Sequence, residues 1–216
     1  MKSVLVVGMG RFGRHIAFKM QELGNDVMII DKNAETIDEL APLFTDAQIG
    51  DCCHEAVLRS IGVNNFDICF VAMGEDFQSS LEITALLKEL GAKHVVSKAN
   101  SERQAGILQK IGADEVVYPE REIAEKMAVR YNEKNIFDFI KLTPEYAIYE
   151  IPIVPAWIGE SISGLGVRQK YNVNIVAVKK GSALKPTPGP DYIFEQDDHV
   201  VVIGKSKDVF ALAKRI

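Results

Sequence analysis

The chain has 216 residues with a formal net charge of −5, and its 47% hydrophobic and 25% charged residues are ordinary for a globular protein with a sizeable core. Lysine and arginine are spread along the chain without a basic block, so we expect no nucleic acid among its partners. The first residues form a strand pattern rather than a signal peptide, and no stretch approaches the roughly 18 apolar residues of a membrane-spanning helix, so we predict a soluble cytoplasmic protein.

Residues 1–118 alternate short β-rich runs with segments of helical periodicity. The expected strands are residues 2–7, 27–30, 47–49, 68–72, 95–97 and 115–118. The expected helices fall between them, at residues 12–23, 33–41, 55–60, 83–90 and 102–111. Strands separated by helices indicate parallel pairing with right-handed crossovers. We therefore predict an α/β fold with a Rossmann-type doubly wound parallel sheet of six strands.

The alternation ends at Pro119, where residues 120–132 have the pattern of an isolated amphipathic helix. No strand of the series follows this helix, so it either packs outside its own sheet, on another subunit, or is a plain terminal helix of the domain. A further short helix is expected at residues 135–142. We place the boundary at Thr143-Pro144, which divides the chain into residues 1–118, a linker at 119–143, and residues 144–216.

Residues 144–216 are expected to form a small α+β domain. Strands dominate it, at residues 147–153, 174–179 and 199–203, with helices near residues 163–170 and 207–215. The segment from Lys185 to Pro190 is expected to be a loop, because its prolines cannot donate to a strand ladder. A domain of this size is small, but it can bury a core of its own.

A glycine-rich motif, Gly-Met-Gly-Arg-Phe-Gly at residues 8–13, follows the first strand and opens the first helix. Gly8 permits a tight turn, Gly10 lets phosphates approach the backbone, and Gly13 lets the helix pack closely on the strand. Free N–H groups at the helix start favour phosphate oxygens. Asp31 closes the second strand, where its carboxylate can accept ribose hydroxyls and would repel a 2′-phosphate. We predict an adenine-nucleotide site that disfavours NADP; the alternative is a glycine-rich turn without a ligand.

Arg11 places a positive charge inside this loop, which favours a polyphosphate such as ATP or ADP; the alternative is a solvated arginine at a helix start. The turns after the third, fourth and fifth strands supply the other expected contacts, since ligands bind at the carboxyl ends of such sheets. The full set of expected nucleotide-binding residues is Gly8, Gly10, Arg11, Phe12, Gly13, Asp31, Lys32, Asp51, Cys52, Cys53, Ala72, Met73, Gly74, Glu75 and Lys98.

No catalytic set accompanies the motif. The four histidines have no evident acid–base partner in the sequence; they are His15, His54, His94 and His199. A dehydrogenase also needs a proton donor from a substrate domain, and the short second domain offers little for that role. We therefore predict that the protein is not an enzyme and that the nucleotide acts as a signal.

Two other classes of function stay open at this point. An NAD(H)-linked oxidoreductase or redox sensor is compatible with Asp31, and Cys52 beside the pocket would be its redox-active group. A vicinal disulfide between Cys52 and Cys53 is conceivable, but free thiols, with Cys69 a third, are expected in a reducing cytoplasm. The remaining class is a stand-alone nucleotide-binding regulator of a partner that is not a channel.

Four segments of the first domain resemble a known family: Val-Val-Gly-Met-Gly-Arg-Phe-Gly at 6–13, Ile-Gly-Asp at 49–51, Val-Ala-Met-Gly-Glu at 71–75 and Lys-Ile-Gly-Ala-Asp-Glu-Val-Val-Tyr-Pro-Glu at 110–120. They are similar to the potassium-transport regulators of the Ktr/Trk type (TrkA/KtrA-like), also called RCK or KTN proteins. The second domain resembles the C-terminal RCK module of this family through residues 165–171 and 175–178. The resemblance covers essentially the whole chain.

This resemblance implies a cytoplasmic gating ring of eight copies, built from homodimers and docked beneath a membrane potassium translocation subunit. Family members bind ATP or ADP, and some bind NAD(H), and exchange between nucleotides changes the shape of the ring and the conductance of the pore. The helix at residues 120–132 matches the crossover helix that joins two subunits of a dimer. The implied location is the inner face of the cell membrane, through the partner.

The resemblance also implies roles for individual residues. The glycines of the motif and Arg11 would hold phosphates, Arg11 acting across the dimer, while Asp31 would hold the ribose and Asp51 with Cys52 the adenine. Glu120 occupies the acidic position where some members bind a divalent cation, Mg²⁺ or Ca²⁺, beside the phosphates; the alternative is a carboxylate that only favours the helix start. Several relatives bind cyclic di-AMP in the second domain, where Arg168 and Asn174 would make polar contacts.

Overall fold

A computed structural model describes residues 1–74, 76–132 and 135–216. The chain divides into two units, residues 1–120 and residues 121–216, each with its own sheet.

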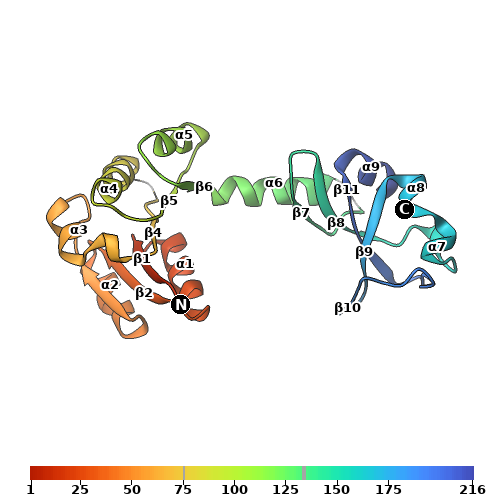
Figure 1. Cartoon of the computed structure of the whole chain (residues 1–216), viewed down its shortest axis with the longest axis horizontal. Coiled ribbons are helices and arrows are strands. Elements are labelled where there is room, and N and C mark those ends of the chain that lie inside the picture. The colour runs from red at the N-terminus through yellow and green to blue at the C-terminus, as the bar shows by residue number, and fades with distance from the viewer. Residues whose placement is uncertain (75, 133–134) are drawn as a thin grey trace. The chain divides into compact units, whose positions relative to one another are not determined.

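The described residues of unit 1 form a six-stranded sheet in the order β3-β2-β1-β4-β5-β6 (Figure 1). Every pair of neighbouring strands is parallel. The strands are β1 (Ser3–Val7), β2 (Asp26–Asp31), β3 (Asp46–Ile49), β4 (Ile68–Val71), β5 (Val95–Lys98) and β6 (Glu115–Val117). This arrangement confirms the predicted Rossmann-type doubly wound sheet.

Helices cover both faces of this sheet because alternate residues of its strands point to opposite sides. Val4 and Val6 of β1 lie in a core cluster with side chains of α1 and α2, whereas Leu5 and Val7 lie in a second cluster with side chains of α3 and α4. The helices of the unit are α1 (Arg11–Glu22), α2 (Ala34–Leu40), α3 (Glu55–Ile61), α4 (Phe77–Glu89) and α5 (Glu102–Lys110), with short 3-10 helices η1 (Ala41–Leu43) and η2 (Val63–Asn65).

The strand order reverses between β1 and β4, and this reversal creates the place for a ligand. From β1 the chain moves outward through β2 to β3, and from β4 it moves the other way to β6. The loops at the carboxyl ends of β1 and β4 therefore part in opposite directions and leave a crevice between them. The two loops begin side by side, since Ala72 N donates to Val7 O at 2.8 Å.

The helix α6 (Pro119–Asn132) follows unit 1's last strand, as predicted. None of its residues is buried, and its apolar side chains are strongly solvent-exposed: Ile123 is 59%, Met127 50% and Tyr131 74% exposed. These three residues are spaced by four, so they lie along one stripe of the helix.

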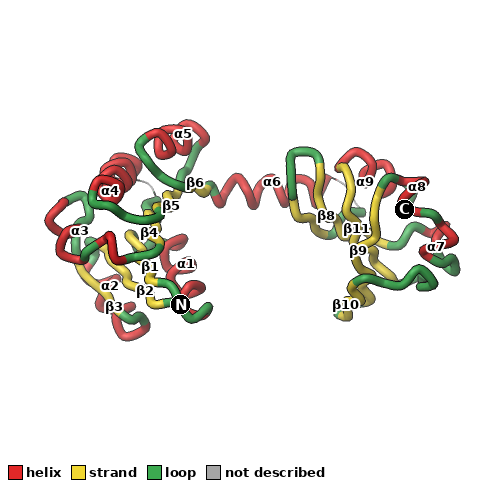
Figure 2. Tube along the Cα trace, in the orientation of Figure 1, coloured by secondary structure: helices red, strands yellow, loops and turns green. Residues whose placement is uncertain are grey.

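The described part of unit 2 contains a five-stranded sheet in the order β10-β9-β11-β8-β7, in which every neighbouring pair is antiparallel (Figure 2). The strands are β7 (Asp138–Lys141), β8 (Tyr146–Pro152), β9 (Val173–Lys180), β10 (Ala183–Pro186) and β11 (Asp198–Lys205). Its other elements are η3 (Pro155–Trp157), α7 (Ile162–Leu165), α8 (Val167–Tyr171) and α9 (Ser206–Ala213). The predicted small α+β domain is thus confirmed.

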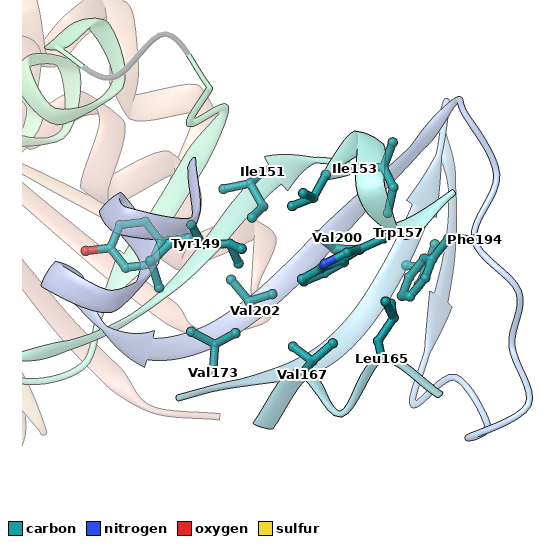
Figure 3. Close-up of a cluster of buried hydrophobic side chains, with 14 of the residues drawn as sticks. Tyr149, Ile151, Ile153, Trp157, Leu165, Val167, Val173, Phe194, Val200 and Val202 are labelled. Carbon is teal, nitrogen blue, oxygen red and sulfur yellow. The ribbon is translucent and has the colours of Figure 1, made fainter. Parts of the chain in front are cut away.

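The core of unit 2 is centred on Trp157, which is fully buried. Its ring lies 5.7 Å from that of Phe194 and 5.5 Å from that of Tyr171, measured between centroids. Inward-facing residues of β8 and β11, such as Ile151 and Val200, complete this cluster (Figure 3). The two units therefore have separate hydrophobic cores.

The helix predicted at residues 135–142 is wrong, because this segment contains strand β7. Phe139 faces the core and stacks on Tyr149, with ring centroids 5.7 Å apart, while its neighbours Asp138 and Ile140 are exposed. That alternation has the period of a strand. The boundary predicted at residue 144 falls between β7 and β8, which pair with each other.

Two further predictions in unit 2 need correction. Lys185 and Pro186, predicted as part of a loop, end strand β10, where proline is tolerated because β10 is an edge strand. The helix predicted at residues 163–170 is two short helices, α7 and α8, separated by Gly166 with a φ of +58°. A left-handed residue ends a helix, which explains the break.

Replacing Trp157 with alanine should destabilise unit 2 by about 3–5 kcal/mol, because a fully buried indole leaves a cavity that the surrounding side chains only partly fill. Backbone hydrogen exchange, followed peptide by peptide, should show lost protection in β8 and β11 and unchanged protection in β1 and β4. Leu184→Ala is the control, since Leu184 is 57% exposed. Equal loss of protection in both units would contradict the separation of the two cores.

Candidate functional site

The glycine-rich loop at residues 8–13 connects β1 to α1, and each glycine has a distinct geometric requirement. Gly8 has a φ of +93°, and a Cβ there would lie 3.0 Å from Met73 Sδ. A Cβ on Gly13 would lie 1.9 Å from Gly8 O, so only glycine allows the helix to approach the strand this closely. A Cβ on Gly10 would meet nothing within 4 Å and would project into the open space beside the loop.

The N-terminus of α1 has features that favour the binding of an anion. Gly10 is the N-cap and has no side chain to accept hydrogen bonds from the first-turn N–H groups. The first turn carries no acidic residue, and its first residue is Arg11, which is exposed. Unpaired N–H groups and the helix dipole both favour negative charge at this position.

Asp31, the last residue of β2, is held rigidly beside this loop. Its Oδ2 accepts a hydrogen bond from Met9 N at 2.6 Å, and its Oδ1 accepts one from Asn33 N at 2.8 Å. Asn33 is in turn the N-cap of α2, as predicted, and its side chain accepts from Thr36 N. Each carboxylate oxygen has a second lone pair, so Asp31 remains able to accept hydrogen bonds from a ligand's hydroxyl groups.

A cavity opens at the carboxyl ends of β1, β2 and β4, beside the glycine-rich loop. We call it the Asp31 cavity. Its lining residues are Val7, Gly8, Gly10, Ile30, Asp31, Lys32, Gly50, Asp51, Cys52, Ala72, Met73, Gly74, Ser79 and Ile83.

Asp51 and Cys52 lie at the β3 side of this cavity. A hydrogen bond from Cys53 N to Asp51 Oδ1, 3.0 Å long, lowers the pKa of Asp51 below its ordinary value and keeps the carboxylate ionised. Burial raises the pKa of Cys52 to about 12, so its thiol is protonated at neutral pH. The three cysteines, at 52, 53 and 69, are free thiols.

A second cavity lies on the other side of the glycine-rich loop, and we call it the Lys98 cavity. Lys98 Nζ, at the end of β5, donates to Glu120 Oε1 at 2.8 Å and lies 5.9 Å from the centroid of the Phe12 ring. Asn100 donates from its side-chain amide to Gly74 O at the same edge. The lining residues are Gly10, Arg11, Phe12, Ala72, Gly74, Lys98, Asn100 and Glu120.

The two cavities meet at the glycine-rich loop, since Gly10, Ala72 and Gly74 line both. The structure thus brings together most of the residues predicted from the sequence. Two predicted residues line neither cavity: Gly13, which packs behind the loop, and Cys53. Glu75 lies outside the described residues.

Several lining residues were not predicted from the sequence. The apolar ones follow from the fold, because Val7 ends β1, Ile30 is the residue before the end of β2, and Ile83 faces the sheet from α4. Gly50 lies in the Ile-Gly-Asp motif directly after β3, and Asn100 lies two residues after β5. Both could have been predicted from their positions just after the end of a strand. Ser79 had no such signal, because its place depends on how α4 is rotated.

In unit 2, Arg168 and Asn174 are also brought together. Arg168 Nε donates to Asn174 Oδ1, and both residues line a cavity with Ile175. Pro188 and Pro190, from the predicted proline-rich loop, form another wall of this cavity.

The described residues contain no group of three or more histidine, cysteine or acidic side chains that could hold a metal ion. Two histidines lie near a carboxylate: His94 Nε2 is 4.0 Å from Glu115 Oε2, and His199 Nδ1 is 2.9 Å from Glu150 Oε1. The His199 pair belongs to the sheet of unit 2, and neither His94 nor His199 lines any of the three cavities described above.

Comparison with known proteins identifies both halves of the chain. The TrkA-N domain model matches residues 4–119, and the TrkA-C domain model matches residues 147–216. The Ktr system potassium uptake protein C of Bacillus subtilis (strain 168) is 36% identical over 100% of this chain and 97% of its own length. The Ktr system potassium uptake protein A of the same organism is 34% identical over 96% and 94%, respectively.

Solved structures show the same fold at lower identity. The GsuK RCK domain superposes with a TM-score of 0.69 at 17% identity, covering 100% of this chain and 47% of that one. The GsuK channel bound to NAD superposes with a TM-score of 0.65 at 16% identity, covering 96% of this chain and 38% of that one. GsuK bound to ADP superposes with a TM-score of 0.55 at 14% identity, covering 62% of this chain and 36% of that one.

The helices in the described part of the chain lack the length and apolar character needed to cross a membrane. Both domain models match in order, and the Ktr relatives align along nearly their full length. The chain therefore belongs to the TrkA-N/TrkA-C family that includes the Ktr system potassium uptake proteins.

Proposed function

We propose that this protein is a non-enzymatic, nucleotide-binding regulatory subunit that controls a membrane potassium transporter or channel from its cytoplasmic face. The observation that carries the proposal is the pair of cavities that meet at an uncapped helix start, with Asp31 on one side and Arg11 and Lys98 on the other. The Ktr relatives are named as potassium uptake proteins, which supports the link to potassium transport.

The arrangement suits a dinucleotide or an adenosine polyphosphate. A ribose beside Asp31 would donate its hydroxyls to the carboxylate, and the phosphates would lie over Gly10 against the start of α1. Asp51 with Cys52 would line the adenine end. ATP and ADP are favoured over NAD(H), because Arg11 and Lys98 provide positive charge beyond Gly10. The related structures bound to NAD and to ADP are consistent with a site that accepts both classes.

An NAD(H)-linked redox sensor or oxidoreductase is the alternative. The high pKa of Cys52 argues against redox chemistry at that thiol, since the thiolate is the reactive form and Cys52 is protonated at neutral pH. The acidic partner of His199 is in the other unit's sheet, so the pair gives the Asp31 cavity no acid–base catalyst within its own unit.

Control of a membrane partner requires an assembly that changes shape. The exposed stripe of Ile123, Met127 and Tyr131 on α6 has the character of an interface, and we assign it to a homodimer in which α6 crosses to a second copy. Four such dimers would form an octameric ring beneath the membrane subunit. A nucleotide shifts the ring between two shapes only through contacts that differ between those shapes.

Two further ligands belong to this proposal. Mg²⁺ or Ca²⁺ would bind between the Glu120 carboxylate and phosphate oxygens, which are the oxygen ligands that hard cations prefer. Cyclic di-AMP would bind the cavity of unit 2, where Arg168 and Asn174 offer polar contacts and Ile175 with the prolines offers apolar walls. Titrating the purified chain with cyclic di-AMP, with Arg168→Ala as the comparison, tests the second assignment.

Calorimetric titration of the nucleotide-free protein with ATP, ADP, NAD and NADH, with and without Mg²⁺, tests the proposed function. We expect measurable and different affinities for ATP and ADP, and ATP-dependent changes in potassium flux after reconstitution with a Ktr-type membrane subunit. Preference for NAD(H) with weak ATP and ADP binding would support the redox-linked alternative instead.

Asp31→Asn should weaken binding of ATP, ADP and NAD alike, by about tenfold, because a charge-assisted hydrogen bond to the ribose is replaced by a neutral one. Asp38→Asn, on the exposed face of α2, is the matched control and should leave all three affinities unchanged. Unaltered affinity in the Asp31 variant would place the ribose elsewhere.

Arg11→Ala should reduce the difference between ATP and ADP affinities while leaving the melting temperature within about 2 °C of the original, since Arg11 is exposed and outside both cores. Parallel titrations and thermal unfolding measure the two effects. Equal loss of affinity for both nucleotides would contradict a role for Arg11 in telling them apart.

A further inference from the structure

The glycine-rich loop is held at Met9 from two sides. The Met9 N–H donates to Asp31 Oδ2 at 2.6 Å, and the Met9 carbonyl oxygen accepts a hydrogen bond from Arg14 Nε at 3.0 Å. Met9 itself is buried. The two peptide units that flank Met9 are therefore each fixed by a side chain from outside the loop.

Arg14 also holds the next carbonyl group along the chain. Its backbone N–H donates to Gly10 O at 3.0 Å. Arg14 thus binds two successive carbonyl groups, one through its side chain and one through its main chain. In a planar trans peptide the C=O and N–H groups point in opposite directions. The N–H groups of Gly10 and Arg11 therefore point away from the atoms of Arg14 that hold these carbonyls.

The two cavities meet on the side of the loop that is opposite Arg14. Gly10 lines both the Asp31 cavity and the Lys98 cavity, whereas Arg14 lines neither. Among the residues that the structure describes, none accepts a hydrogen bond from the Gly10 N–H. This donor is therefore free to bind a phosphate oxygen above the loop.

The Met9–Gly10 peptide needs such a restraint because Gly10 has no Cβ, so steric contacts restrict its rotation less than at other residues. Arg14 is itself restrained by Glu39 of α2, with Nη1 3.2 Å from Oε2. The two side chains are 35% and 63% exposed, so the ion pair contributes little stability of its own. Its effect is to limit the rotamers of Arg14.

Helix α2 thus reaches Met9 by two routes. At its N-cap, the Asn33 N–H donates to the same Asp31 carboxylate that accepts from Met9 N. Farther along the helix, Glu39 holds Arg14, which donates to Met9 O. The first route positions the carboxylate assigned to the ribose, and the second positions the peptide that faces the phosphates.

We propose that Arg14 is a positioning residue, which orients the Met9–Gly10 peptide so that the Gly10 N–H faces the phosphates of a bound nucleotide. The inference rests on the proposed function and deepens it. Arg14 does not touch the ligand; it acts through the main chain of the loop. Without Arg14 the peptide samples other orientations, and apparent affinity falls in proportion to the fraction of loops that stay productive.

The test uses the full chain, purified without nucleotide, with ADP titrated directly and adenosine measured by its competition with ADP. Arg14→Met keeps an unbranched side chain and removes its donors. We expect it to lower ADP affinity about tenfold, as when a tenth of the loops stay productive, and to leave adenosine affinity unchanged. The loss should be the same at low and high ionic strength, because it arises from geometry rather than from long-range charge.

Two further variants separate positioning from charge. Glu39→Gln loosens Arg14 and should lower ADP affinity by a smaller factor, whereas a purely electrostatic role for Arg14 predicts a rise when the nearby negative charge is removed. Lys19→Met is the matched control, since Lys19 is a cation of the same helix that pairs with Glu22 and lines neither cavity. It should leave both affinities unchanged.

Three results would overturn the inference. Equal loss of ADP and adenosine affinity in Arg14→Met would make Arg14 a general support of the fold, a loss that disappears at high ionic strength would make it a distant charge, and unaltered ADP affinity would leave it without a role. Glu39 is exposed, so its variant decides the question if Arg14→Met does not fold. If the unaltered chain binds neither ligand, the proposed function itself fails.

Discussion

The close approach of α1 to β1 is the constraint on which the rest of unit 1 depends. A Cβ at Gly13 would lie 1.9 Å from Gly8 O, so any other residue would push the helix away from the sheet. With the helix in place, its first-turn N–H groups face the crevice where the strand order reverses. The same contact aligns the loop with Asp31, because Met9 N donates to that carboxylate. Packing and ligand geometry are thus set by one pair of glycines.

Charge is distributed unevenly along the site that this contact creates. The Asp31 cavity carries the carboxylates of Asp31 and Asp51, which suit hydroxyl and amino donors of a nucleoside, and one cation, Lys32. The Lys98 cavity carries Arg11 and Lys98, which suit phosphate, together with the Glu120 carboxylate that pairs with Lys98. Carboxylates thus predominate on one side of the glycine-rich loop and cations on the other. The family's two domain models place this site in the TrkA-N half of the chain.

Sequence patterns were sufficient to predict the order of strands and helices in unit 1. Its parallel strands are buried on both faces and helices separate them, so each element has a distinct pattern of apolar residues. They failed at β7, where Ile136, Phe139 and Ile140 are spaced as on a helix although the segment pairs as an edge strand. Strand-end residues of the site were predictable from topology alone. Ser79 was not, because the rotation of α4 about its axis depends on packing that no local pattern encodes.

The fixed carboxylate of Asp31 has a consequence for how such a regulator would respond in a cell. Both of its oxygens are already positioned by backbone N–H groups, so the nucleoside end of the site needs no ordering when a ligand arrives. Ligands that share an adenosine half would then compete for one preformed anchor. The fraction of sites that each nucleotide occupies would depend on its concentration divided by its dissociation constant, compared with the same quotient for the competing nucleotides. A chain saturated in this way would respond to the ratio of two nucleotides and stay insensitive to their total amount.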